Sequence, residues 1–126
     1  LAGRETVLVV EDEEGVRMLA VETLTRRGYQ VLAAESGEAA LAVASNYDGT
    51  IHVLLTDVVM PGMTGIELTR TIRSLPHLAP TPIIMLSART LPHELEEGMK
   101  SGADMYLSKP FSPSTLIAAV NKVLAV

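Results

Sequence analysis

The chain has 126 residues, of which 48% are hydrophobic, and this length and composition predict one domain with a packed core rather than a disordered segment. A net charge of -5 and an aromatic content of 3% argue against direct contact with nucleic acid, while the absence of cysteine excludes disulfides and suits a cytoplasmic protein. No apolar stretch approaches the roughly 20 residues of a membrane span, so we expect no membrane insertion by this chain.

Short apolar runs, each typical of a strand buried on both faces, alternate with segments of helical period along the first half of the chain. Residues 7–10 predict a strand, and a helix follows that Gly28 should end. A second strand over 31–34 leads to a helix that begins after Ser36, and a third over 53–55 leads to a helix with a capping-box pattern at its start. The apolar stripe expected to face the core from the first helix consists of Val16, Leu19, Ala20 and Leu24.

The second half of the chain continues this alternation. A strand over 83–86 precedes a helix that begins near Pro92 and ends at Gly102, and a strand over 105–107 precedes a helix that begins at Pro113. Strict alternation predicts a parallel sheet with helices on both faces. We therefore expect an α/β fold, the (βα)5 flavodoxin-like doubly wound sandwich, with a five-stranded parallel sheet of order 2-1-3-4-5. It should form one domain over residues 1–126 with a core of about 6–124.

Hydrophilic groups stand where four of these strands end. The first strand runs into Glu11 and Asp12, the third into Asp57, the fourth into Ser87 and the fifth into Lys109. Ligands of such sheets bind beyond the carboxyl ends of the strands. Three carboxylates that meet there raise one another's pKa unless a cation joins them, and Mg2+ is the natural one because it prefers oxygen ligands. The set favours phosphoryl transfer to a carboxylate, with Asp57 as the attacking group.

The stretches "VLVVEDE", "LLTDVVMPGMTGIEL", "PIIMLSA" and "GADMYLSKPF" resemble the receiver domain of two-component response regulators over essentially the whole chain. The resemblance implies that Asp57 takes a phosphoryl group from a phosphohistidine on a histidine kinase or a histidine phosphotransfer domain. It also implies that Asp12 binds Mg2+ directly, that Glu11 binds it through water, and that the backbone carbonyl of Val59 is a further ligand. The resemblance further implies a phosphoacceptor with self-directed phosphotransfer chemistry rather than a turnover enzyme, while the parent chain of a hybrid protein would be a histidine kinase.

The same resemblance assigns roles across the site. Lys109 would pair with the phosphoryl group, the Lys109–Pro110 peptide bond would be cis, and Ser87 would hydrogen-bond to the phosphoryl oxygens. On phosphorylation, Ser87 would move inward and Tyr106 would turn its ring toward the interior. This would remodel the surface made by the last two helices and the strand between them, where partners or a second receiver bind to give a homodimer. Arg89 would reach the mouth of the site and alter the lifetime of the phosphoryl group.

Two residues depart from the commoner choices of the family. Ser87 stands where threonine is more frequent, so its rotamer is less restricted, and Glu11 stands where aspartate is more frequent. Met18 and Val21 lie off the core stripe of the first helix. They form either an apolar patch on which a histidine-bearing helical bundle docks or two ordinary exposed residues.

Several alternatives concern the parent protein and the chemistry. The lead-in "GRETVLVVEDEEGVR" resembles receivers that are part of hybrid sensor histidine kinases, whose membrane anchor would lie elsewhere, and the alternative is a stand-alone or truncated response regulator. A Mg2+-dependent phosphohydrolase would carry a second aspartate two residues after the nucleophile, where this chain has Val59. An interaction module without chemistry would lack part of the acid set or Lys109. Zinc is disfavoured because His52, His77 and His93 have no ligand-like spacing.

Overall fold

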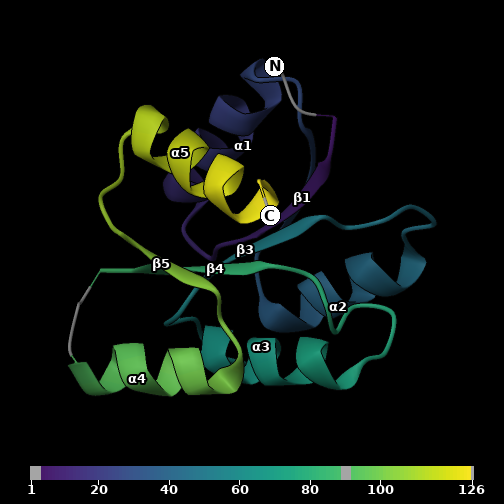
Figure 1. The fold of residues 1–126 in the computed structure, drawn as a ribbon, viewed down its shortest axis with the longest axis vertical. Helices are drawn as coiled ribbons and strands as arrows, with labels where there is room; N and C mark the ends of the chain where they lie inside the picture. Colours follow the sequence, from purple (N-terminus) through teal and green to yellow (C-terminus); the bar gives the residue numbers. More distant parts are fainter. Residues whose placement is uncertain (1–3, 89–91, 126) are drawn as a thin grey trace.

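The computed structural model describes residues 4–88 and 92–125, in which strands and helices alternate (Figure 1). The strands are β1 (Thr6–Val10), β2 (Gln30–Ala34), β3 (Val53–Asp57), β4 (Ile83–Ser87) and β5 (Met105–Ser108). The helices are α1 (Glu14–Arg26), α2 (Gly37–Asn46), α3 (Gly65–Ser74), α4 (Pro92–Ser101) and α5 (Pro113–Leu124). None of the helices in this described part has the length and apolar character that a membrane crossing needs.

The strands form one parallel sheet in the order β2-β1-β3-β4-β5, which confirms the predicted flavodoxin-like topology. In the register of the last strands, Asp57 stands opposite Leu86, and Ser87 stands opposite Ser108. Because the strands are parallel, their carboxyl ends meet along one edge of the sheet.

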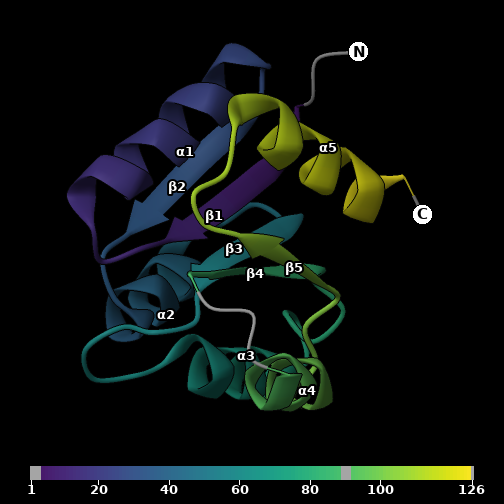
Figure 2. The same cartoon turned by 90° about the vertical axis from the view of Figure 1, so that its left-hand side faces the viewer.

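Helices cover both faces of the sheet. Helices α1 and α5 lie on one face, and α2, α3 and α4 lie on the other (Figures 1 and 2). Alternate residues of β1 serve the two apolar cores that result: Val7 and Val9 pack with α1 and α5, whereas Leu8 and Val10 pack on the side of α2, α3 and α4. All of β1, β3 and β4 is buried, so the central strands anchor the carboxyl edge rigidly.

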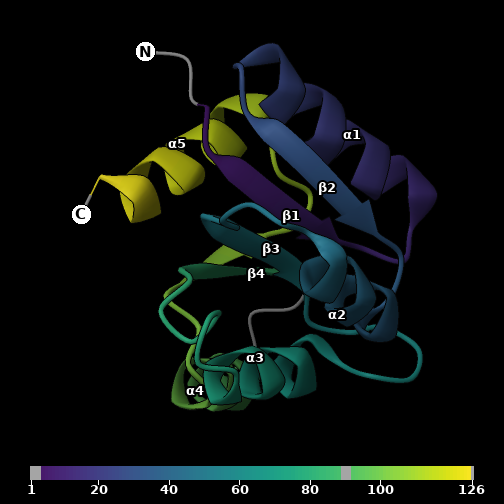
Figure 3. The same cartoon turned by 90° about the vertical axis from the view of Figure 1, so that its right-hand side faces the viewer.

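The two edge strands are more open than the expected burial on both faces. In β2 only Ala34 is buried, and no residue of β5 is fully buried. Figure 3 shows β2 at the rim of the sheet with β1 on its inner side. An edge strand has one neighbouring strand, so the helices cover it less completely. The apolar runs therefore predict the strands correctly but overstate the burial of these two.

Local signals determine where the helices begin and end. Thr64 Oγ1 accepts a hydrogen bond from Glu67 N at 3.1 Å, and Thr64 N donates to Glu67 Oε1 at 2.9 Å, which completes the predicted capping box of α3. Ser112 caps α5, with proline at the first position of the helix. Gly28 and Gly102 follow α1 and α4 with φ angles of 93° and 117°, a conformation that glycine adopts without steric cost.

The core-facing stripe of α1 differs from the predicted one. Ala20 and Leu24 are buried and Val16 is partly buried, whereas Leu19 is 40% exposed. The buried line has one residue per turn at spacings of four, and Leu19 lies one position off that line at the edge of the contact. Met18, beside it, is 51% exposed. Leu19 therefore belongs to the outer surface of the helix.

Arg73, near the C-terminal end of α3, joins two connecting segments. Its Nε and Nη2 atoms donate to the carbonyl of Gly102 at 3.0 and 2.6 Å, and Nη1 donates to the carbonyls of Ala79 and Thr81 at 2.7 and 2.5 Å. Nη2 also pairs with Asp104 Oδ2 at 2.9 Å, and the same oxygen accepts the first backbone N–H of β4 at 2.8 Å. One guanidinium thus holds the entries to β4 and β5 together.

We expect Arg73→Ala to lower the free energy of unfolding by about 2–3 kcal/mol, because hydrogen bonds from a charged group contribute about 1.5–3 kcal/mol and the carbonyls would lose their donors. Arg70→Ala, at an exposed position of the same helix, is the matched control and should change stability by no more than about 0.5 kcal/mol. Urea unfolding followed by circular dichroism measures both. Equal losses in the two variants would contradict the role given to Arg73.

Candidate functional site

The carboxyl ends of β1, β3 and β5 bring charged side chains together. Glu11 and Asp12 follow β1, Asp57 is the last residue of β3, and Lys109 directly follows β5. One oxygen of each of the three carboxyl groups lies within 4.8 Å of the other two. Lys109 Nζ is 2.7 Å from Glu11 Oε1 and 3.2 Å from Asp57 Oδ1. Residues that are up to 98 positions apart in the sequence (109 − 11) thus meet at one point.

These groups open into a crevice of about 480 Å³. Glu11 lies beneath it and is fully buried, with its Oε2 atom accepting a hydrogen bond from Glu13 N at 3.0 Å. The carboxylate of Asp57 reaches the crevice, so an incoming group can approach it from solvent. The residues that line the crevice are Asp12, Glu13, Asp57, Val58, Val59, Ser87, Ala88 and Lys109.

Burial and charge shift the ionisation of the site. Burial raises the pKa of Asp57 above its usual range, and the charge of Asp12 adds to this, while Lys109 acts against it. Burial likewise raises the pKa of Glu11, against the hydrogen bonds from Lys109 and Glu13. Burial alone would lower the pKa of Lys109, but its contacts with Glu11 and Asp57 outweigh that effect and raise it. The ammonium therefore stays charged, and its single charge does not fully offset the carboxylates.

The donor set fits a hard divalent cation. Glu11, Asp12 and Asp57 each direct one carboxylate oxygen to the same small volume, and such oxygens are the preferred ligands of Mg2+. Val59 also borders the crevice, and the residue is 71% exposed. Within residues 4–88 and 92–125 this is the single group of three or more acidic or histidine side chains placed to hold a metal ion.

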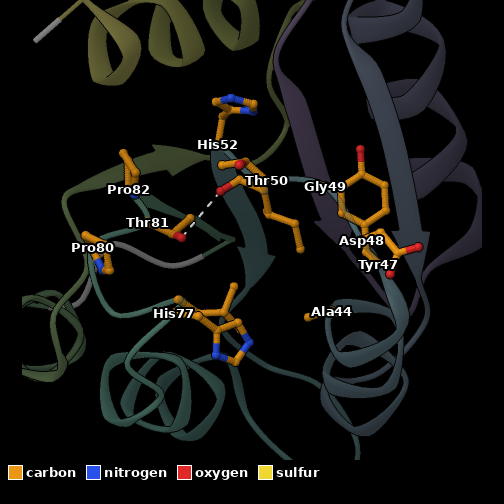
Figure 4. Close-up of a pocket in the computed structure, with 12 residues that line it drawn as sticks. Ala44, Tyr47, Asp48, Gly49, Thr50, His52, His77, Pro80, Thr81 and Pro82 are labelled. Atoms are coloured by element: carbon orange, nitrogen blue, oxygen red, sulfur yellow. Dashed lines mark hydrogen bonds between the residues drawn. The ribbon is translucent and has the colours of Figure 1, made fainter.

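A second hollow, of about 520 Å³, lies at the end of the sheet where β3 and β4 begin, between the end of α2 and the segment that enters β4 (Figure 4). His52 and His77 line it, as does Tyr47. His52 Nδ1 accepts a hydrogen bond from Thr6 N at 2.9 Å, so this ring has a structural partner at the start of β1. In the described residues neither histidine joins a group of metal-ligating side chains. The two hollows are similar in volume, and the crevice at the carboxyl edge differs from this one in its cluster of acidic side chains.

Gly65, the first residue of α3, also shapes the site, and the sequence indicates it only as part of the capping-box pattern between Thr64 and Glu67. A Cβ atom at this position would overlap the backbone carbonyl oxygen of Asp57. Gly65 N donates to the carbonyl of Val58 at 2.9 Å, which brings the start of α3 directly against the end of β3. This close approach depends on the folded chain, and the only signal in the sequence is the glycine at the start of a helix.

The other predicted site residues are distributed as follows. Ser87 ends β4, is buried, and borders the crevice together with Val59. Tyr106 lies on β5 and packs toward α4, beside rather than within the acid cluster. The Lys109–Pro110 peptide bond is cis. Arg89 lies outside the described residues.

A parallel sheet of this order, with an acidic crevice and a lysine at its carboxyl edge, suits a class of protein that binds a divalent cation and a phosphoryl group. The sequence model of the family described as "Response regulator receiver domain" matches residues 7–121, and the chain therefore belongs to this family. It is a phosphoacceptor receiver domain of two-component signalling.

Named relatives of the chain support its membership of this family. The chain is 40% identical over 114 residues to the uncharacterized transcriptional regulatory protein YrkP of Bacillus subtilis, a match that covers 90% of this chain and 47% of YrkP. It is 38% identical over 120 residues to the phosphate regulon transcriptional regulatory protein PhoB of Pseudomonas aeruginosa, which covers 95% and 52%. The chain thus spans about half the length of these relatives.

The solved structure of the chemotaxis protein CheY4 of Vibrio cholerae is similar throughout. It superposes with a TM-score of 0.91 at 37% identity and covers 96% of this chain and 99% of CheY4.

We expect Asp57→Asn to raise the free energy of unfolding at pH 7–8, without added metal, because the substitution removes a carboxylate whose pKa burial raises. Lys109 keeps Glu11 as a partner. A raised folded-state pKa means that stability is greatest below the unfolded pKa and falls as the pH rises through the folded one. Urea unfolding across pH 4–8 should therefore show a smaller fall in Asp57→Asn than in the wild type. Lower stability of the variant at pH 7–8 would contradict this assignment.

Proposed function

We propose that Asp57 is the phosphoacceptor of this receiver domain. The observation that carries the proposal is the position of its carboxylate, which borders the open crevice and lies 3.2 Å from Lys109 Nζ. Glu11 also pairs with Lys109 but is fully buried beneath the crevice. Asp12 borders the crevice, and its side chain is exposed. Of the three carboxylates, Asp57 combines access for a donor with a positive charge beside it.

In the proposed step, a carboxylate oxygen of Asp57 attacks the phosphorus atom of a phosphohistidine. An O–P bond forms, the N–P bond breaks, and its electron pair returns to the imidazole nitrogen of the donor. The ammonium of Lys109 offsets the negative charge of the phosphoryl oxygens, and its raised pKa keeps it protonated during the transfer. Ser87, which borders the same crevice, donates its hydroxyl hydrogen to a phosphoryl oxygen.

Glu11, Asp12, Asp57 and the backbone carbonyl of Val59 are the groups that would hold Mg2+ in this site. When bound, the ion supplies positive charge to the carboxylates and the phosphoryl oxygens. The full burial of Glu11 and its 2.7 Å pair with Lys109 support a contact through water for this residue rather than a direct one.

We infer that Ser87 and Tyr106 carry the signal from the site to the surface formed by α4, β5 and α5. The two residues lie on neighbouring paired strands, with Met85 opposite Tyr106 and Ser87 opposite Ser108. The partial exposure of β5 supports a surface that can change when Tyr106 moves. A second receiver that binds there would give a homodimer.

We propose that the donor, a histidine kinase or a histidine phosphotransfer domain, docks along α1. Val21 is partly buried, so the apolar patch consists of Met18 and Leu19, which are 51% and 40% exposed. Leu19 also lines a groove of about 350 Å³ between α1 and α5, together with Ile117. Exposed apolar residues beside a groove suit a helical partner whose phosphohistidine must reach the crevice, which Asp12 and Glu13 border just before α1 begins.

For the parent protein, the named relatives do not support the expected hybrid sensor histidine kinase, because YrkP and PhoB are transcriptional regulators and CheY4 is a chemotaxis protein. We infer instead that residues 1–126 form one receiver domain of a response regulator. The net charge of -5 argues against direct contact between these residues and nucleic acid, and the lack of cysteine suits a cytoplasmic location.

Incubation of the wild-type chain with Mg2+ and acetyl phosphate is expected to add one phosphoryl group by intact mass. Asp57→Asn should show no gain. Lys109→Met should slow the gain by about 10²-fold, which is the effect that the loss of one charge-stabilising hydrogen-bond donor has in other active sites. Glu14→Gln, at an exposed acid of α1, is the control and should react at the wild-type rate. A gain that persists in Asp57→Asn, or no gain in the wild type, would refute the proposed acceptor.

The affinity for Mg2+ should fall as the pH is lowered, and the fall should begin above the usual carboxyl range. A metal ligand must be deprotonated, and burial raises the pKa values of both Asp57 and Glu11. The rise of Tm on adding Mg2+ is therefore expected to be full near pH 8 and to disappear under acidic conditions. Asp12→Asn should reduce that rise at pH 8, whereas a rise of unchanged size from pH 8 to 4 would argue against the proposed ligands.

A further inference from the structure

Gly98 occupies an unusual position for a glycine. It lies in the interior of α4 and is buried, and the glycines with positive φ in the described residues are Gly28, Gly62 and Gly102, so no special backbone conformation requires it. Glycine in a helix interior is less favourable than alanine because it loses more conformational entropy on folding. A packing reason is therefore needed.

The packing partner of Gly98 is Tyr106. A Cβ atom at position 98 would overlap the Tyr106 hydroxyl oxygen and would lie 2.7 Å from Cζ of the ring and 3.1 Å from Met85 Sδ. Tyr106 and Met85 are paired residues of β5 and β4, and both side chains pack on the face of the sheet that α4 covers. The tyrosine ring thus spans the space between β5 and α4, and its hydroxyl occupies the place of the missing side chain.

We propose that Gly98 is the positioning residue for Tyr106: its missing side chain forms a socket on α4 that receives the hydroxyl and determines how readily the ring docks there. Ser87 lies two residues after Met85, so its side chain leaves β4 on the same face as the docked ring. The effect on signalling rests on the switch role proposed for Tyr106. Phosphorylation of Asp57 favours the docked ring. A side chain at position 98 fills the socket and therefore weakens the response of the surface formed by α4, β5 and α5.

The socket itself is tested by stability, without any phosphodonor. Gly98→Ala should lower Tm in the wild-type background, because the ring must leave, whereas in a Tyr106→Leu background the same substitution should raise Tm through helix propensity. Gly15→Ala in α1 is the control, since nothing lies within 4 Å of a Cβ atom there, and it should not lower Tm. A change of the same sign in both backgrounds would overturn the proposal. If Gly98→Ala does not fold, recovery of the fold by Tyr106→Leu supports the socket and failure to recover it overturns it.

The functional consequence is tested by 19F NMR of chains with 3-fluorotyrosine at the three tyrosines, the Tyr106 signal being assigned by its absence in Tyr106→Phe. In the wild type, Mg2+ with beryllium trifluoride, a mimic of the phosphoryl group, should shift the Tyr106 signal. In Gly98→Ala the signal should be displaced from the start and its response should be several-fold smaller, with phosphoryl uptake by intact mass retained. An undiminished response would overturn the link to the switch.

A wild type that takes up no phosphoryl group would instead refute the proposed acceptor, and the Tm comparison would still decide whether the socket exists.

Discussion

Two buried carboxylates, those of Glu11 and Asp57, share the single ammonium group of Lys109 at the carboxyl edge of the sheet. Burial raises the pKa of each carboxyl group, which shows that their charge is disfavoured, and Asp12 adds a third negative charge close by. The ammonium offsets only part of this charge. The site is therefore receptive to a divalent cation, and through that cation to the oxygens of a phosphoryl group.

Such a charge imbalance persists only if the surrounding structure holds the groups together. The buried strands β1 and β3 carry the three carboxylates to one edge, and apolar cores on both faces keep these strands in place. Gly65 allows α3 to begin directly against the end of β3. Arg73 joins the entries to β4 and β5, so that Lys109 leaves the sheet from a defined position. The stability of the scaffold thus supports an arrangement that is itself unfavourable.

Side chains of β4 and β5 that pack against α4 connect this site with the proposed partner surface. Ser87 borders the crevice, and Tyr106 lies against α4 on the same side of the sheet. Since Gly98 offers no side chain, the position of the tyrosine ring depends on a close fit between a strand and a helix. A fit of this kind has few intermediate arrangements, and this is a property expected of a switch.

The sequence by itself determined the five strands, the parallel topology and the charged groups at the strand ends, because apolar periodicity and strand order follow from local pattern and connectivity. It likewise determined Thr64 as the N-terminal cap of α3, since a cap involves residues within one turn. Only the tertiary structure decided that Leu19 lies outside the core, and that Gly65 and Gly98 are sites of close contact. These features depend on which surfaces of distant segments meet, and no local pattern of residues encodes the distance between two segments that become neighbours only on folding.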